Sequence, residues 1–138
     1  MVILAVDYGD ARTGLAVCDQ GEMLASPAGM IAESYAPKVI AAIGSKAAAL
    51  GVQKIIVGLP RNMDGSYGDR AEKCRSFAAE LEKQTGLPCE LFDERLTTVA
   101  AHRVLNEVNV RGKRRKLVVD TVAAVMILED YLRMTKSQ

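Results

Sequence analysis

The spacing of four short apolar runs is the feature of this sequence that most constrains its fold. Residues 2–8 (VILAVDY) and 12–19 (RTGLAVCD) are apolar, β-branched and joined by a short turn-rich link, which predicts adjacent antiparallel strands. A third strand is expected after the turn at 20–21. The runs at 54–60 and 89–93 are each preceded by a helical stretch, so these two strands are expected to enter the sheet through helical crossovers.

Apolar residues recur at helical spacing in the stretches between and after these later runs. Four helices are expected, at 35–50, from near Ser66, at 97–108, and from the opening of the run LVVDTVAAVMIL at 117–128. Ser34 is a candidate N-cap of the first helix and Gly51 is its expected stop. The element order is therefore βββαβαβαα. We expect one α/β domain over residues 1–138, with a meander of three strands at its start.

Composition narrows the classes of protein that fit. The chain has 138 residues, and its 49% hydrophobic and 25% charged content suits an ordinary soluble globular domain. Because 18 basic and 17 acidic residues nearly cancel, attraction to a polyanion must come from local clusters of charge. Cys18, Cys74 and Cys89 form no C-x-x-C pair, which favours core packing in a reducing cytoplasm. Without a basic leader or a membrane-length apolar run, no membrane association is expected.

Acidic residues stand where strands end and where the last helix opens. Asp7 ends the first strand, and Asp93 and Glu94 stand at the end of the fifth. Asp120 is the one ionisable residue in LVVDTVAAVMIL, where an unpaired buried carboxylate would be costly. We therefore expect Asp120 to share a metal site with acids from elsewhere in the chain. Strand alternation allows one of Asp93 and Glu94 to face that site, and ordinary turn or surface roles are the alternative for each acid.

Two further segments have features of phosphate binding. Residues 57–66 (VGLPRNMDGS) carry a buried strand into a loop that contains Asn62 and precedes a helix N-terminus. Five of the six residues at 111–116 are basic: Arg111, Lys113, Arg114, Arg115 and Lys116. A strand-to-helix turn and a solvated loop are the ordinary alternatives. The basic run lies close in sequence to Asp120, which favours phosphate binding beside a metal-binding carboxylate.

Four segments of the chain together resemble one known family. They are AVDYGDARTGLAV at 5–17, IIVGLPRNMDGS at 55–66, FDERLTTVAA at 92–101 and VDTVAAVMILEDYL at 119–132. In this order they resemble the YqgF family of Holliday-junction-resolvase-like nucleases, in the ribonuclease H-like superfamily. The resemblance implies a five-stranded mixed sheet, three strands antiparallel and two parallel, flanked by helices. It also implies that the metal-binding acids are Asp7, Glu94 and Asp120, with Asp93 fitting less well than its neighbour.

The resemblance implies hydrolysis of phosphodiester bonds. Two divalent ions roughly 4 Å apart can stabilise the attacking and departing oxygens, and Mg²⁺ and Mn²⁺ prefer carboxylate ligands. We expect Asp7 to bridge the ions, Glu94 and Asp120 to complete their coordination, and a bound water to attack phosphorus. Bacterial members of the family are implicated in maturing the 5′ end of 16S rRNA. Precursor rRNA, with ribosomal precursor particles as a partner, or branched DNA is therefore the expected substrate, for a monomer or a weak homodimer.

Two other interpretations stay open at this point. The segment DYGDARTG also resembles the phosphate loop of actin-like ATPases and sugar kinases, but those proteins close a second domain over the nucleotide and 138 residues leave no room for one. A nucleic-acid-binding module that no longer cuts is the other alternative, since its acids could persist for metal-assisted folding. His102, the single histidine of the sequence, is expected to have a structural or solvent-facing role.

Overall fold

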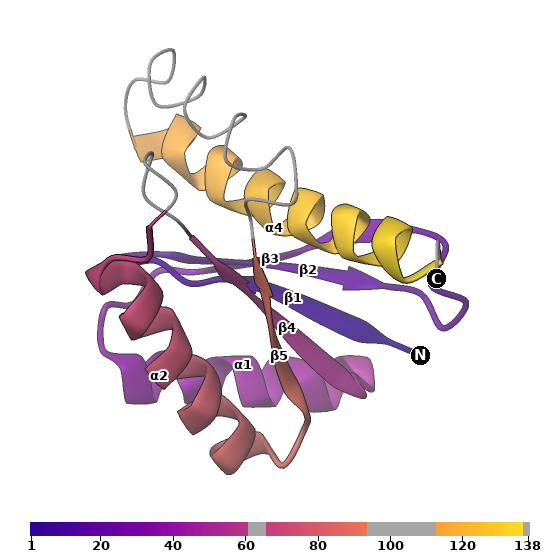
Figure 1. The fold of residues 1–138 in the computed structure, drawn as a ribbon, viewed down its shortest axis with the longest axis horizontal. Coiled ribbons are helices and arrows are strands. Elements are labelled where there is room, and N and C mark those ends of the chain that lie inside the picture. Colours follow the sequence, from indigo (N-terminus) through magenta and orange to yellow (C-terminus); the bar gives the residue numbers. More distant parts are fainter. Residues whose placement is uncertain (61–65, 94–112, 137–138) are drawn as a thin grey trace.

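The fold is built on one five-stranded sheet with the strand order β3-β2-β1-β4-β5 (Figure 1). The computed structural model describes residues 1–60, 66–93 and 113–136. The strands are β1 (Ile3–Asp7), β2 (Thr13–Cys18), β3 (Ala25–Ile31), β4 (Lys54–Leu59) and β5 (Cys89–Asp93). Four strands match the expected apolar runs and β3 follows the turn at 20–21, so the predicted strands are confirmed.

Pairing within the sheet is mixed, as expected. Strand β2 pairs antiparallel with both β1 and β3, whereas β4 pairs parallel with both β1 and β5. In this register Asp7 lies opposite Gly14, and Leu59 lies opposite Asp93. The carboxyl ends of β1, β4 and β5 therefore meet at one edge of the sheet, which is the edge where α/β folds place their ligands.

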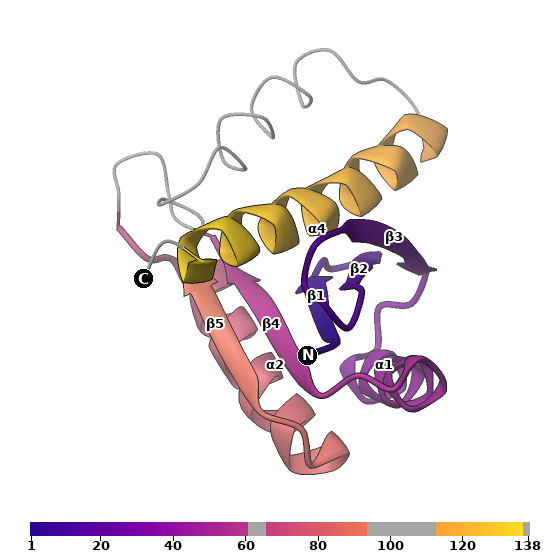
Figure 2. The ribbon, with the colours of Figure 1, turned by 90° about the vertical axis from the view of Figure 1, so that its right-hand side faces the viewer.

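Helices cover both faces of the sheet (Figure 2). Helices α1 (Ala36–Leu50) and α2 (Asp69–Thr85) lie on one face, and α4 (Lys113–Lys136) lies across the other. Among the described residues, no helix is both long enough and apolar enough to cross a bilayer. The helix expected at 97–108 falls outside the described residues.

The expected helix boundaries need three corrections. Helix α1 follows Tyr35, and its N-terminus has no side-chain cap, so Ser34 is not the cap. Helix α2 begins at Asp69, later than the expected start near Ser66. Helix α4 begins at Lys113, so most of the basic run lies inside the helix instead of preceding it. The expected stop of α1 is confirmed, because Gly51 adopts the left-handed conformation (φ 69°) that favours glycine.

The sheet separates two apolar clusters. Leu4 and Val6 pack toward α1 and α2, whereas Ile3 and Ala5 pack toward α4, as strand alternation requires. The cysteines contribute to this packing: Cys18 and Cys74 are buried, and Cys89 is half-buried. Burial raises the pKa of the Cys89 thiol to about 12, so its thiolate is disfavoured.

The second half of α4 is fastened to the starts of β4 and β5 by three polar side chains. Lys54 Nζ donates to the Tyr131 hydroxyl at 2.5 Å and pairs with Glu90 at 2.5 Å, while the same hydroxyl donates to Glu90 at 3.0 Å. Partial burial opposes both charges. Their mutual hydrogen bonds and those to Tyr131 nevertheless raise the pKa of Lys54 and lower that of Glu90.

Removing the Tyr131 hydroxyl is expected to loosen this attachment. Tyr131→Phe should lower the free energy of unfolding by about 1 kcal/mol, because the two partly buried charges lose a shared hydrogen-bond partner. For a chain of this size, that corresponds to a fall in melting temperature of about 3 to 6 °C. Tyr35→Phe is the matched control, since that side chain is exposed and no change is expected there. Equal melting temperatures for the two variants, measured by circular dichroism, would contradict this account.

Candidate functional site

Asp7 places a carboxylate at the carboxyl edge of the sheet. It is the last residue of β1 and is only 6% exposed. Two residues earlier, Ala5 packs in the cluster under α4, so the alternation of the strand directs Asp7 toward the same face. The candidate site therefore lies between the end of β1 and α4.

Asp120 lies in the first half of α4, whose last turns are held at the opposite, amino edge of the sheet. Tyr131, near the end of α4, contacts Lys54 at the start of β4, and Lys136 donates to the Glu22 carbonyl at 2.6 Å. Asp120 precedes Tyr131 by 11 residues, about 16 Å along a helix axis. Figure 2 shows that α4 crosses the sheet, with its first turns on the β3 side and its last turns near β5.

Asp93 faces the other side of the sheet. Leu91, two residues earlier, packs with the cluster under α1 and α2, whereas Phe92 contacts the Tyr131 ring edge-on at 5.6 Å on the α4 side. The Asp93 carboxylate accepts a hydrogen bond of 2.8 Å from the Tyr67 hydroxyl. This placement supports the expectation that Asp93 fits the metal site less well than its neighbour. Glu94 itself lies outside the described residues.

The residues expected to bind nucleic acid divide into two groups. Asn62 and Arg111 lie outside the described residues, as does His102. Lys113–Lys116 form the first turn of α4, which contains no acidic residue. A helix N-terminus carries a partial positive charge, so cations placed there are unfavourable for the helix and favourable for an approaching anion. The basic run therefore coincides with the positive end of the α4 dipole.

The expected metal site has one ligand whose side chain the structure describes, and that is Asp7. Within the described part of the chain, no three Asp, Glu, His or Cys side chains gather closely enough to hold a metal ion. The buried carboxylate of Asp7 at this edge, together with the all-carboxylate set of Asp7, Glu94 and Asp120, fits the hard oxygen preference of Mg²⁺ or Mn²⁺.

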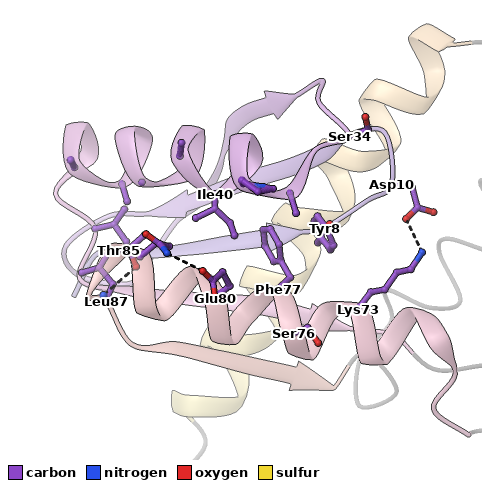
Figure 3. A pocket seen from close by; sticks show the side chains of 18 of the residues that line it. Tyr8, Asp10, Ser34, Ile40, Lys73, Ser76, Phe77, Glu80, Thr85 and Leu87 are labelled. Carbon is purple, nitrogen blue, oxygen red and sulfur yellow. Dashed lines mark hydrogen bonds and ion pairs between the residues drawn. The ribbon is translucent and has the colours of Figure 1, made fainter.

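The loop between β1 and β2 is held by α2, a feature that the sequence did not reveal. Arg70 donates hydrogen bonds to the carbonyl oxygen of Tyr8 and, at 2.7 Å, to the carboxylate of Asp10. The Tyr8 ring stacks on Phe77 with centroids 3.8 Å apart (Figure 3). No pattern in the sequence of α2 indicates which loop these side chains meet, because the contact depends on the tertiary fold.

A groove of about 1220 Å³ runs between α1 and α2. Apolar side chains such as Ile40 and Phe77 lie in it, and polar side chains such as Ser76 and Glu80 line the α2 side (Figure 3). Tyr8 also lines the groove, where burial raises the pKa of its phenol. The groove lies on the α1 and α2 face of the sheet, whereas Asp7 is directed toward the α4 face.

Comparison with known families identifies the chain. A family model described as RuvX, Holliday junction resolvase, matches residues 1–134. The chain belongs to this family. Its relatives include two proteins named "Putative pre-16S rRNA nuclease". The one from Halothermothrix orenii is 45% identical over 96% of this chain and 94% of its own length, and the one from Moorella thermoacetica is 43% identical over the same shares.

Solved structures agree with the family in fold. A structure of Thermus thermophilus RuvC has a TM-score of 0.59 and 14% identity, covering 98% of this chain and 97% of that one. The same protein in complex with a Holliday junction substrate gives a TM-score of 0.57 and 15% identity, covering 97% and 96%. At such identities the likeness shows the fold alone. The family resemblance and the ribonuclease H-like fold class predicted from the sequence are both confirmed.

Proposed function

We propose that residues 1–138 form one metal-dependent nuclease domain that hydrolyses phosphodiester bonds of structured nucleic acid. The observation that carries this proposal is Asp7, a buried carboxylate at the end of β1 that faces the helix bearing Asp120. Membership of a family named for Holliday junction resolvases supports the activity. Relatives over 40% identical that are named as rRNA nucleases point to the same reaction class.

Three carboxylates would hold Mg²⁺ or Mn²⁺ in this site: Asp7, Glu94 and Asp120. When bound, the ion supplies charge stabilisation at the scissile phosphate and activates water. Asp7 contributes a ligand whose position is fixed by the β1 ladder and whose burial limits solvent access. Asp120 would contribute its carboxylate from the first half of α4, the helix that covers the face toward which Asp7 is directed.

Phosphate binding is proposed for Asn62 and the basic run, Arg111, Lys113, Arg114, Arg115 and Lys116. The start of α4 adds the charges of Lys113–Lys116 to the positive end of the helix dipole. A nucleic-acid backbone bound there would lie at the edge that holds Asp7. Binding and cleavage would then use adjacent surfaces.

Precursor 16S rRNA is the substrate that the relatives favour, acted on in the cytoplasm and in contact with ribosomal precursor particles. Branched DNA remains a second candidate, because the family is described as Holliday junction resolvases. A monomer or weak homodimer is expected. A junction has two strands to cut symmetrically and suits a dimer, whereas trimming one RNA end suits a monomer. Mass measurement in solution would distinguish them.

Cleavage of two substrates side by side tests the proposal. A 16S rRNA fragment with a 5′ extension and a four-way DNA junction would be incubated with the chain and Mg²⁺ or Mn²⁺. Cleavage of either substrate supports a nuclease, and the faster one identifies the substrate class. Binding without cleavage of both would favour the inactive binding module. ATP hydrolysis in the absence of nucleic acid would favour the kinase-like alternative.

Neutralising the basic turn should weaken binding without regard to sequence. Replacing Arg114, Arg115 and Lys116 together by alanine is expected to lower the salt dependence of binding, since each lost phosphate contact reduces the slope by about 0.9 for duplex DNA. Fold stability should barely change, because cations at a helix N-terminus do not stabilise the helix. Binding titrations between low and physiological salt provide the measurement.

The double variant Lys38→Ala and Lys46→Ala is the matched control for these charges. Both lysines belong to α1, which covers the other face of the sheet. The salt dependence of nucleic-acid binding should fall less in this double variant than in the α4 variant. If the α4 variant kept the slope of the unmodified protein, the basic turn would be a solvated part of α4 only.

A further inference from the structure

We propose that Arg70 is a positioning residue that holds the β1–β2 loop and, through it, the carboxylate of Asp7. This inference rests on the proposed function, because it gives the loop contacts a role in the metal site. It concerns a side chain on α2, on the opposite face of the sheet from α4. Arg70 would therefore act without touching the metal or the reacting phosphate.

The guanidinium of Arg70 joins the first turn of α2 to two points of the loop. One nitrogen donates to the carbonyl oxygen of Tyr8, and the other donates to the Asp10 carboxylate at 2.7 Å. Lys73 lies 3.8 Å from the same carboxylate oxygen, as a weaker second cation (Figure 3). The fork of an arginine fixes two acceptors at once, which the single ammonium of a lysine cannot do with the same geometry.

The loop has few ways to adjust if these contacts are lost. Only residues 8–12 separate the end of β1 from the start of β2. A Cβ at Gly9 would overlap the carbonyl oxygen of Arg12, so the chain turns too tightly there for any side chain. The Tyr8 ring is stacked on Phe77 with an interplanar angle of 9°. Helix α2 therefore holds the loop by the polar contacts of Arg70 and Lys73 and by the stacking of Phe77 on Tyr8.

Asp7 immediately precedes Tyr8, the residue whose carbonyl Arg70 binds. The carbonyl that Arg70 binds belongs to Tyr8, so a shift of this carbonyl moves the backbone at the end of β1. Metal ligands must be held within about 0.5 Å of their working geometry, and loss of supporting contacts typically costs 10-fold to 100-fold in metal affinity or activity. Arg70 supplies such support from the far face of the sheet.

A direct phosphate contact is the main alternative role for a basic side chain near this edge. Two nitrogens of the Arg70 guanidinium donate to the protein's own loop, and the side chain is 36% exposed. A phosphate contact would show itself in nucleic-acid affinity, whereas a positioning role would show itself in metal binding and turnover. The two roles are therefore separable by measurement.

The test compares Arg70→Ala, Arg70→Lys and a matched control, Arg75→Ala. Arg75 lies on the same helix with the same 36% exposure, but it pairs with Glu72 and lies over the Tyr67 ring. For each variant, the Mn²⁺ concentration that gives half of the maximal thermal stabilisation would be measured without nucleic acid. The dissociation constant for nucleic acid without metal, kcat and KM would follow.

Arg70→Ala should raise the Mn²⁺ midpoint by about 10-fold and lower kcat by a similar factor, with KM and metal-free affinity nearly unchanged. Arg70→Lys should show smaller changes in the Mn²⁺ midpoint and in kcat. Arg75→Ala should have the Mn²⁺ midpoint and kcat of the unmodified protein. An unchanged Mn²⁺ midpoint for Arg70→Ala would overturn the proposal, and so would a loss confined to nucleic-acid affinity. If Arg70→Ala does not fold, Arg70→Lys, which cannot hold both acceptors with the same geometry, should still shift the Mn²⁺ midpoint in the same direction; no shift overturns the proposal.

Failure of this inference can be told apart from failure of the proposed function. Asp7→Asn, measured in the same Mn²⁺ titration, should lose most of the stabilisation. If Asp7→Asn responds to Mn²⁺ as the unmodified protein does, the metal site itself is wrong. If Asp7→Asn loses the response and Arg70→Ala keeps it, the metal site stands and the positioning role of Arg70 is wrong.

Discussion

Asp7→Asn is expected to lower the rate of nucleic-acid cleavage by more than about 100-fold while the protein stays folded. Loss of a supporting residue around a metal already costs 10-fold to 100-fold, so loss of a ligand should cost more. Asparagine has nearly the same shape as aspartate, and removing a buried charge at a 6% exposed position lowers the desolvation penalty. The measurement is single-turnover cleavage, with circular dichroism to confirm the fold.

Asp93→Asn is the matched control for this prediction. It is also an acid at the carboxyl end of a strand, but it faces α2 and accepts a hydrogen bond from Tyr67, which an asparagine oxygen can also accept. Cleavage by this variant should stay within a few-fold of the unmodified protein. If Asp93→Asn lowered the cleavage rate more than Asp7→Asn did, Asp93 and not Asp7 would be the metal ligand.

Asp120→Asn is expected to separate nucleic-acid binding from cleavage. Without metal, the acids of the site repel one another, so the variant should melt at the same temperature or higher. With Mn²⁺ it should lose most of the stabilisation that the ion gives. It should still bind nucleic acid but should cleave it more than about 100-fold more slowly, because a ligand is missing. Thermal melting with and without Mn²⁺, together with cleavage assays, measures all of these effects.

Full divalent-dependent cleavage by Asp120→Asn would show that Asp120 is not a metal ligand. If the variant unfolded instead, Asp120 would be a capping or pairing residue of α4 and its place in an apolar run would have a structural explanation. Val125→Thr provides a control for adding polarity to α4, because that side chain is only half-buried. Its cleavage should be close to that of the unmodified protein.

Strand positions were predictable because burial and alternation are local properties. The run CELFD matches β5 residue for residue, and the apolar run at 54–60 differs from β4 by one residue. Helix starts were harder to predict because several neighbouring residues can each take the N-cap position. Tyr35 takes the N-cap position of α1 with an extended backbone, so Ser34 lies one residue outside the position where its hydroxyl could cap the helix. Helix α4 starts early because lysine and arginine are good helix formers.

The candidate site was only partly predictable for a different reason. Asp7 could be selected because it ends a strand whose neighbours are apolar, a pattern visible in the sequence. The side of the sheet toward which Asp93 points could be determined only from packing, because Leu91 and Phe92 lie on opposite sides of the sheet. Arg70 had no sequence signal, since its contacts join a helix to a loop about 60 residues earlier. Contacts of this kind depend on topology and not on local pattern.

Cleavage in the presence of a chelator tests the central claim most directly. The unmodified protein would be stripped of metal with EDTA, mixed with whichever of the precursor rRNA and the DNA junction it cuts faster, and then supplied with Mg²⁺ or Mn²⁺. The account predicts no cleavage in EDTA and full recovery when either ion is added in excess, since carboxylates without a divalent ion cannot activate water for this reaction. Cleavage at the same rate in EDTA would contradict it.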